Sequence, residues 1–253
     1  IQELSPHLAD LIAAGEVVER PASVAKELIE NAIDAGATRV TVEIENGGIS
    51  YLRIADNGCG MSPEDAAIAF RRHATSKLRT ESDLAAIGTL GFRGEALAAI
   101  SAVSHIDLFT KQADTIAGLH MHLDAGKVAE QEEAGCPDGT TMIIRGLFYN
   151  TPARMKFLKK DVTEGNSVAG ILDKVALSHP EISFRFIRDG KEQLHTPGDG
   201  KLSSAVYAVY GKEFFSTLIP VDYVLGGVRV WGYVSKPAGR RATRSMQSIF
   251  ING

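Results

Sequence analysis

The chain has 253 residues, of which 44% are hydrophobic and 23% charged, and its formal net charge is −4. These values are ordinary for a globular protein, and the length fits one large domain or a domain and a half. Apolar runs are short and no charged segment precedes one at the N-terminus, so we expect no membrane span and no signal peptide. Cys59 and Cys136 do not make a disulfide framework, which favours a reducing cytosol. A net negative chain needs a local basic patch to contact DNA.

Capping residues and hydrophobic spacing predict helices and strands along the whole chain. Ser5-Pro6 and Pro21 mark two early helix starts, and Asn46-Gly47-Gly48 turns one strand back into the next. The predicted helices are 6–14, 22–35, 63–70, 95–102, 163–179 and 201–210. The predicted strands are 40–44, 49–55, 105–110, 117–124, 140–147, 183–188, 214–225, 228–235 and 247–252. This order predicts an α+β fold, a two-layer sandwich with helices on one face of a mixed sheet.

Two segments interrupt the pattern. Residues 73–94 mix Thr, Ser, Gly and charged residues, and such a long irregular segment inside a domain is usually functional. Residues 196–200, Thr-Pro-Gly-Asp-Gly, form the best linker. We therefore predict one domain over 1–198 and the beginning of a second, smaller α/β domain over 201–253. The second unit is too small to bury a core, and the chain stops within a predicted strand, so we expect a fragment.

A carboxylate and an amide stand one helical turn apart on the predicted helix 22–35. Glu27 and Asn31 are separated by four residues and lie opposite the apolar stripe. The carboxylate is able to deprotonate an attacking water, and the amide oxygen suits Mg²⁺. Spacing alone favours a simpler interpretation, a solvated helix face in which Lys26 pairs with Glu30.

A carboxylate followed by two glycines ends the predicted strand 49–55. In Asp56-Asn57-Gly58-Cys59-Gly60, Asp56 is able to accept a hydrogen bond from an exocyclic amine such as that of adenine. Gly58 and Gly60 let the backbone approach a flat base. An ordinary Asp-Asn-Gly turn is the commoner meaning of this pattern when it stands alone, with Cys59 as a small packing residue.

A glycine pair precedes the predicted helix 95–102, in Gly91-Phe92-Arg93-Gly94-Glu95. Free N–H groups and the positive end of a helix hold phosphate oxygens, although a flexible loop has the same pattern. The preceding segment adds Thr75, Ser76 and Lys77, which offer hydroxyls and one cation to a polyphosphate. Thr140, after Gly139, is able to join Asp56 and a water around a base, but alone this pair means little.

Together these blocks make a nucleotide site without a P-loop, and their order resembles the ATPases that include gyrase B, large heat-shock chaperones, histidine kinases and MutL. Four further runs resemble MutL-family signatures specifically. They are Gly15-Glu16-Val17-Val18-Glu19-Arg20-Pro21, Arg72-His73-Ala74-Thr75-Ser76-Lys77, Gly91-Phe92-Arg93-Gly94-Glu95-Ala96-Leu97 and Phe148-Tyr149-Asn150-Thr151-Pro152-Ala153-Arg154. The similarity covers essentially the whole chain and implies a Bergerat-type ATP-binding fold.

The resemblance implies a role for each block. Glu27 is the expected general base, Asn31 the Mg²⁺ ligand and Asp56 the residue that reads adenine. Residues 71–94 are the expected ATP lid, which brings Thr75, Ser76, Lys77 and the loop Gly91, Phe92, Arg93, Gly94 and Glu95 to the phosphates. The expected cofactors are therefore ATP and Mg²⁺.

The resemblance also implies a place in DNA mismatch repair. Family members close their N-terminal domains into a dimer on binding ATP, hydrolyse it slowly, and relay recognition from a MutS-type sensor to a nicking enzyme and a helicase. We accordingly expect a cytoplasmic protein, associated with the nucleoid in a bacterium, whose N-terminal arm orders against its partner. The family's second domain supplies a lysine to the γ-phosphate from beyond residue 253, so we expect this chain to hydrolyse ATP poorly.

Other features leave alternatives open. Arg154, Lys156, Lys159 and Lys160 form one basic cluster and Arg240, Arg241 and Arg244 another, each fitting either DNA phosphates or a solvated surface. His120 and His122 share one strand face, where a surface pair is a better interpretation than a metal site. The rival functions are a related topoisomerase subunit or chaperone, a histidine kinase, and a module that binds nucleotide only to assemble with partners.

Overall fold

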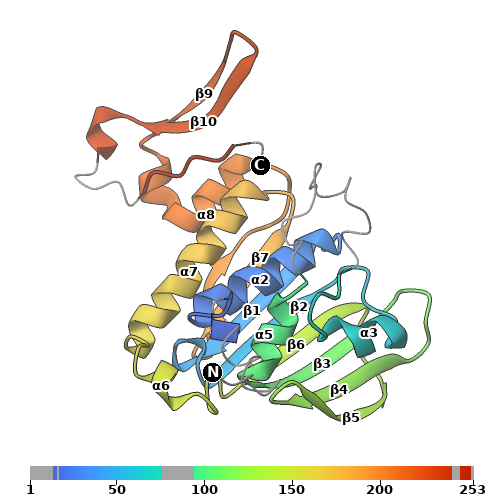
Figure 1. Cartoon of the computed structure of the whole chain (residues 1–253). Coiled ribbons are helices and arrows are strands. Elements are labelled where there is room, and N and C mark those ends of the chain that lie inside the picture. Colours follow the sequence, from blue (N-terminus) through green and yellow to red (C-terminus); the bar gives the residue numbers. More distant parts are fainter. Residues whose placement is uncertain (1–13, 16, 76–93, 241–245, 252–253) are drawn as a thin grey trace.

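The computed structural model describes residues 14–15, 17–75, 94–240 and 246–251 (Figure 1). A large mixed sheet carries helices on one face, and a small unit with a hairpin stands beyond it. This is the α+β, two-layer arrangement that the sequence predicts. No helix in the described ranges is long and apolar enough to cross a membrane.

The large sheet has eight strands in the order β5-β4-β3-β6-β2-β1-β7-β8. Neighbouring strands are antiparallel except β1 and β7, which run parallel. Two further strands, β9 and β10, pair only with each other. The strands are β1 (Arg39–Glu45), β2 (Tyr51–Asp56), β3 (His105–Lys111), β4 (Gly118–Asp124), β5 (Lys127–Ala134), β6 (Gly139–Arg145), β7 (Ser183–Arg188), β8 (Lys191–His195), β9 (Leu218–Leu225) and β10 (Val228–Ser235).

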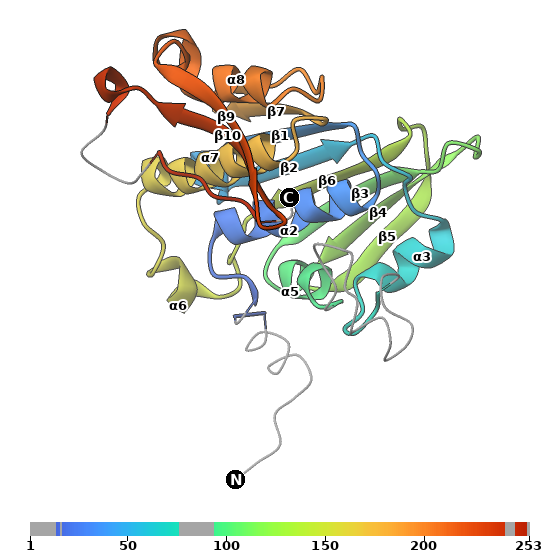
Figure 2. The same ribbon diagram turned by 90° about the horizontal axis from the view of Figure 1, so that it is seen from above.

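The helices cover one face of the sheet, with α2 and α7 side by side (Figures 1 and 2). The helix α2 also contacts α5 and β2, so it lies at the centre of the layer. The helices are α2 (Pro21–Asp34), α3 (Pro63–Ala69), α5 (Ala96–Ala102), α6 (Pro152–Met155), α7 (Asp161–Ser178) and α8 (Leu202–Phe215), with 3-10 turns η1 (Asn46–Gly48) and η2 (Pro237–Gly239).

The core forms where the predicted apolar stripes meet. In β1, Val40, Val42 and Ile44 are all buried, as their alternation predicts. On α2, Leu28 and Ile29 lie in the same core, so this helix turns its apolar stripe to the sheet and keeps its polar residues away from it.

Five parts of the chain differ from the sequence prediction. The strand β5 was not predicted because seven of its eight residues are exposed and it lacks alternation. The short elements β8 and α6 were missed for a similar reason, since each has few or no buried residues. The helix α8 continues past its predicted end through a kink at Gly211, whose φ is 79°. No strand forms at 246–251, so the predicted strand over 247–252 is wrong for the described part of that segment.

The small unit has little core of its own. Leu177 of α7 packs with Ala205 and Val206 of α8, and Tyr233 of β10 lies against this cluster. The rest of the β9–β10 hairpin is largely exposed and projects from the body (Figure 1). This agrees with the expectation that the second unit cannot bury a core, while the boundary predicted near residue 200 stays a prediction.

Candidate functional site

The helix α2 carries the first pair of predicted site residues. Pro21 stands at its start, and Glu27 and Asn31 follow one turn apart, both half-buried. Lys26 lies 3.3 Å from Glu30 and 4.0 Å from Glu27, so its main partner is Glu30. Burial raises the pKa of Glu30, although the neighbouring Lys26 opposes this. The predicted Lys26–Glu30 pair is confirmed, and Glu27 lies at the longer distance from the same lysine.

Asp56 ends β2 beside the strand that carries Thr140, its direct partner in the antiparallel register. The Gly58 N–H donates to Asp56 Oδ1 at 2.8 Å. Burial raises the pKa of the Asp56 carboxyl, while hydrogen bonds from the backbone of Gly58 and Thr140 pull it down. A half-buried carboxylate without a cation is costly, which is typical of a group kept for recognition. The sequence therefore named two residues, 84 positions apart, that the sheet makes neighbours.

Thr110 is a member of this group that the sequence analysis missed. Its hydroxyl lies 3.2 Å from Thr140 Oγ1, donates to the Gly139 carbonyl at 3.1 Å and accepts from the Met61 N–H at 2.9 Å. Thr110 follows Ile106 and Leu108 on the buried face of β3. A hydroxyl at a core position of a strand was the available signal, because buried polar groups are kept where they have partners.

The glycines around Asp56 are required by close contacts. A Cβ on Gly60, whose φ is +68°, would lie 2.1 Å from the Lys111 carbonyl oxygen, and one on Gly58 would lie 2.8 Å from Ala35 Cβ. Asn57 accepts from the N–H groups of Thr38 and Arg39, at 3.0 and 2.7 Å. The loop after β2 is thus fixed between the end of α2 and the end of β3.

The structure describes only some of the residues that are predicted to bind phosphate. Gly94 has a φ of +62°, and a Cβ there would lie 2.6 Å from the Ala74 carbonyl oxygen. Residues 73–74 therefore lie beside the start of α5, and His73 Nδ1 lies 3.5 Å from Glu95 Oε1. The other predicted residues, Ser76, Lys77, Gly91, Phe92 and Arg93, and with them most of the proposed lid 71–94, lie outside the described residues.

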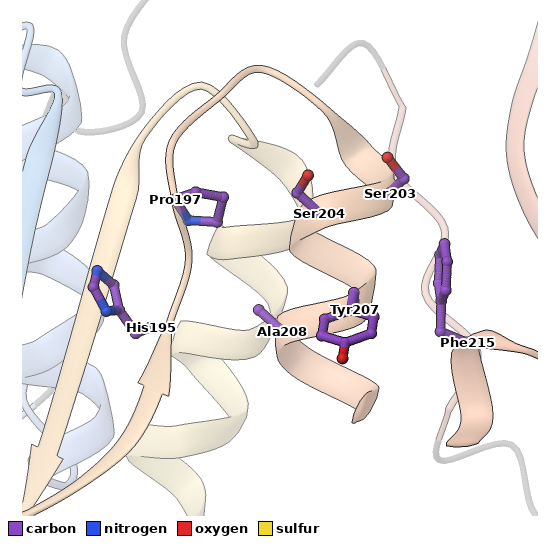
Figure 3. A pocket seen from close by; sticks show the side chains of 7 residues that line it. All are labelled: His195, Pro197, Ser203, Ser204, Tyr207, Ala208 and Phe215. Carbon is purple, nitrogen blue, oxygen red and sulfur yellow. The ribbon is translucent and has the colours of Figure 1, made fainter. Parts of the chain in front are cut away.

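One cavity lies beside this site and a larger one lies away from it. A small one of about 100 Å³ adjoins the Asp56 region, with Met61 and Thr110 among its lining residues. A larger one of about 490 Å³ lies between the end of β8 and α8, where Tyr207 and Phe215 face it (Figure 3). The larger cavity contains no predicted site residue, so the nucleotide site is not assigned to it.

The two histidines of β4 are held by hydrogen bonds. His120 Nε2 and His122 Nδ1 lie 3.3 and 2.8 Å from Asp107 Oδ1, and His120 Nδ1 lies 3.2 Å from Glu132. Burial lowers the pKa of His120, but the carboxylates of Glu132 and Asp107 outweigh it and raise the value. No group of three or more His, Cys, Asp or Glu able to hold a metal occurs among the described residues.

The members of the first basic cluster differ in their surroundings. Arg154 is half-buried, and its Nη1 donates to the Val18 carbonyl at 2.9 Å, while its part in a DNA contact stays a prediction. Lys156, Lys159 and Lys160 remain exposed on the turn after α6. In the second cluster Arg240 is exposed, while Arg241 and Arg244 lie outside the described residues.

The fold and the site define a class of protein. An eight-stranded mixed sheet, a carboxylate–amide helix packed on it, an Asp at a strand end beside a Thr, and a glycine before a second helix are the parts of an ATPase of the gyrase B and heat-shock-chaperone class. The sequence profile of the family described as histidine kinase-, DNA gyrase B-, and HSP90-like ATPase matches residues 19–149. The profile described as DNA mismatch repair protein, C-terminal domain, matches residues 206–253.

Individual relatives narrow the class. The DNA mismatch repair protein MutL of Agathobacter rectalis is 50% identical over 99% of this chain and 39% of its own length. MutL of Symbiobacterium thermophilum is 50% identical over 100% of this chain and 40% of its own length. The solved Aquifex aeolicus MutL ATPase domain complexed with ADP is 31% identical, with a TM-score of 0.70 over 88% of this chain and 80% of that structure. The chain therefore belongs to the MutL family of these ATPases, and it spans about two fifths of the length of its full-length relatives.

Proposed function

We propose that this chain binds ATP with Mg²⁺ and is the ATPase part of a mismatch repair protein. The observation that carries the proposal is the Asp56 carboxylate, half-buried beside Thr140, ringed by glycine backbone and paired with no cation among the described residues. Such a carboxylate is suited to accept from the exocyclic amine of adenine, while its other oxygen stays bonded to Gly58. The ADP bound to the Aquifex relative supports the same ligand class.

The hydrolytic step is assigned to α2. The Glu27 carboxylate orients an attacking water and takes its proton, and the Asn31 amide oxygen, one turn along, holds Mg²⁺. An oxygen donor beside a carboxylate fits the preference of that ion, which when bound neutralises charge on the phosphate oxygens. Gly94 and Glu95 lie directly before α5, where backbone N–H groups would meet phosphate, and Thr75 follows Ala74, which contacts Gly94. Ser76, Lys77 and the loop 91–93 complete the proposed phosphate site.

The cycle we propose rests on the family resemblance. ATP binding closes two N-terminal regions into a dimer, slow hydrolysis opens it, and the cycle relays a MutS-type sensor's signal to a nicking enzyme and a helicase in the bacterial cytoplasm, on the nucleoid. Lys156, Lys159 and Lys160 offer a sequence-independent DNA contact through phosphates. We expect the chain to bind ATP and to hydrolyse it slowly.

The test is a calorimetric titration of the chain with Mg-ADP, beside Asp56→Ala and a control, Asp114→Ala, at an exposed carboxylate. We use ADP because its binding does not need the γ-phosphate lysine. We expect saturable binding by the parent and the control, and none by Asp56→Ala. Equal binding by all three would refute the adenine assignment, and no binding by a folded parent would require the same titration on a longer chain.

A second experiment separates the enzyme from a nucleotide-dependent assembly module. In a full-length protein, Glu27→Ala should keep ATP binding within a fewfold and remove turnover, because Glu27 acts on water and not on the base. A full-length parent that binds ATP but never hydrolyses it would favour the module instead.

A further inference from the structure

The residues just before α2 are held by an ion pair from a distant helix. Arg20 precedes the first residue of α2 and donates from Nε and Nη2 to both oxygens of Glu164 on α7, at 3.0 and 2.9 Å. Two parallel hydrogen bonds of this kind fix direction as well as distance. The pair therefore sets where α2 begins relative to α7.

Glu164 is itself immobilised. Its side chain is 1% exposed, and it also accepts from the Lys159 N–H at 2.9 Å. On the other side, Gly47 of η1 lies so close that a Cβ there would stand 2.6 Å from the Asp161 carbonyl. Burial raises the pKa of Glu164, but the bonds from Arg20 and Lys159 outweigh it, and the value is lowered. A carboxylate buried this deeply is costly unless paired, so its position needs a reason other than stability.

A second contact with the residues before α2 comes from Arg154, whose Nη1 donates to the Val18 carbonyl at 2.9 Å. Its guanidinium lies 5.9 Å from the centre of the Phe148 ring, and a Cβ on Gly15 would collide with Nη2 at 1.6 Å. Two side chains from the segment 148–164 therefore bind the residues before α2: Arg154 at the Val18 carbonyl, and Glu164 at the Arg20 side chain.

The same segment holds α5. The Asn150 amide donates to the carbonyl of Ala102, the last residue of α5, at 2.8 Å, and the Phe148 N–H donates to the Val103 carbonyl at 2.7 Å. The motif Phe148–Arg154 therefore touches the residues that lead into the helix of Glu27 and Asn31, and also the end of the helix that follows Gly94. Asp56 on β2 and Thr140 on β6, which form the base end of the site, make none of these contacts.

We propose that Arg154 and Glu164 are positioning residues for the nucleotide site: they fix the start of α2, and through this rigid helix the places of Glu27 and Asn31 relative to α5. The inference rests on the proposed function. Glu27 lies two helical turns after Arg20, about 10 Å along the axis, so a tilt at the start of α2 displaces the carboxylate and the amide together. Asp56 does not move with them, because strand pairing holds it.

The test uses Arg154→Met, which keeps the apolar stem of the side chain but removes the donor, with Lys174→Met as a control at an exposed lysine of α7. The Kd for ADP is measured by calorimetry in EDTA and in excess Mg²⁺, together with the Tm. We expect Arg154→Met to keep its Kd in EDTA within about twofold of the parent, and to lose at least about fivefold of the Mg²⁺ enhancement. Arg154→Lys should recover part of it, and Lys174→Met should match the parent.

An unchanged Mg²⁺ enhancement in folded Arg154→Met would overturn the proposal. So would an equal loss of affinity in both conditions with a lowered Tm, which is the mark of a purely structural residue. Hydrogen exchange of the ADP-free protein tests the same hold even if the chain binds no nucleotide. Faster exchange of the α2 amides in Arg154→Met and Glu164→Gln, but not in Lys174→Met, is expected, and unchanged exchange would refute the role.

Discussion

The two ends of the candidate nucleotide site are built in different ways. The base end consists of Asp56 and Thr140, which are neighbours because β2 and β6 are paired residue by residue. The phosphate end depends on α2 and α5, whose relative position comes from side-chain packing and from long-range hydrogen bonds such as that of Arg154. Strand register fixes a residue through many backbone hydrogen bonds, whereas a helix is placed by a few contacts. We therefore expect substitutions at the base end to change nucleotide affinity directly, and distant ones to affect the phosphate end alone.

The largest effect is expected from Gly60→Ala at the base end. The new Cβ would meet the Lys111 carbonyl in a backbone conformation with a φ of +68°. We expect the free energy of unfolding to fall by about 3 kcal/mol, and ADP binding to be lost. The control is Gly36→Ala, where φ is +73° but no atom lies within 4 Å, so only about 1 kcal/mol of strain applies. Urea unfolding measures both, and equal losses would show that the close contact is unimportant.

Asp56→Asn should weaken ADP binding about 10- to 100-fold at nearly unchanged stability. The amide presents a donor as well as an acceptor to the adenine amine, and an unsatisfied buried group costs about 1–3 kcal/mol. Calorimetry beside Asp114→Asn, an exposed site, measures the difference. Near-parental affinity of Asp56→Asn would assign the adenine contact to another residue.

Asn31→Ala sharpens the comparison from the phosphate end. Removing the amide oxygen should abolish the Mg²⁺ enhancement of ADP affinity, an effect of about tenfold, and leave the Kd in EDTA unchanged, because Asp56 stays in place. The titration is done in both conditions. A parallel loss in EDTA and in Mg²⁺ would mean that the two ends are not independent.

The smallest effect is expected from Asp173→Asn on α7, the helix beside α2. Burial raises the pKa of Asp173 from 3.8 to about 6. The charged form is therefore disfavoured in the folded protein, and its penalty is fully present above pH 6 and relieved as pH falls toward 3.8. Asp173→Asn should raise the unfolding free energy by about 1–2 kcal/mol at pH 7, less near pH 4, with ADP affinity unchanged. A gain that is independent of pH would point to packing instead of charge.

The sequence by itself determined most of the regular elements and the residue types of the site. Alternation in 40–44 and the stripe on 22–35 predicted β1 and α2, because these elements bury one face and follow the local period. The exposed β5 could not be predicted in this way, since a strand paired on one edge of a sheet and open to solvent needs no alternation. The order of the motifs singled out Asp56 and Thr140, and the family resemblance gave Glu27 and Asn31 their expected roles.

Only the tertiary structure decided which of these residues meet and which basic residues are internal. Thr110 joined the base end because β3 lies beside β6, a pairing between segments 30 positions apart that no local pattern encodes. Arg154 was grouped with the exposed lysines by its neighbours in sequence, but a backbone carbonyl 136 positions earlier turns it inward. Local preferences therefore set the elements, whereas register, packing and long-range hydrogen bonds gave each polar side chain its partner.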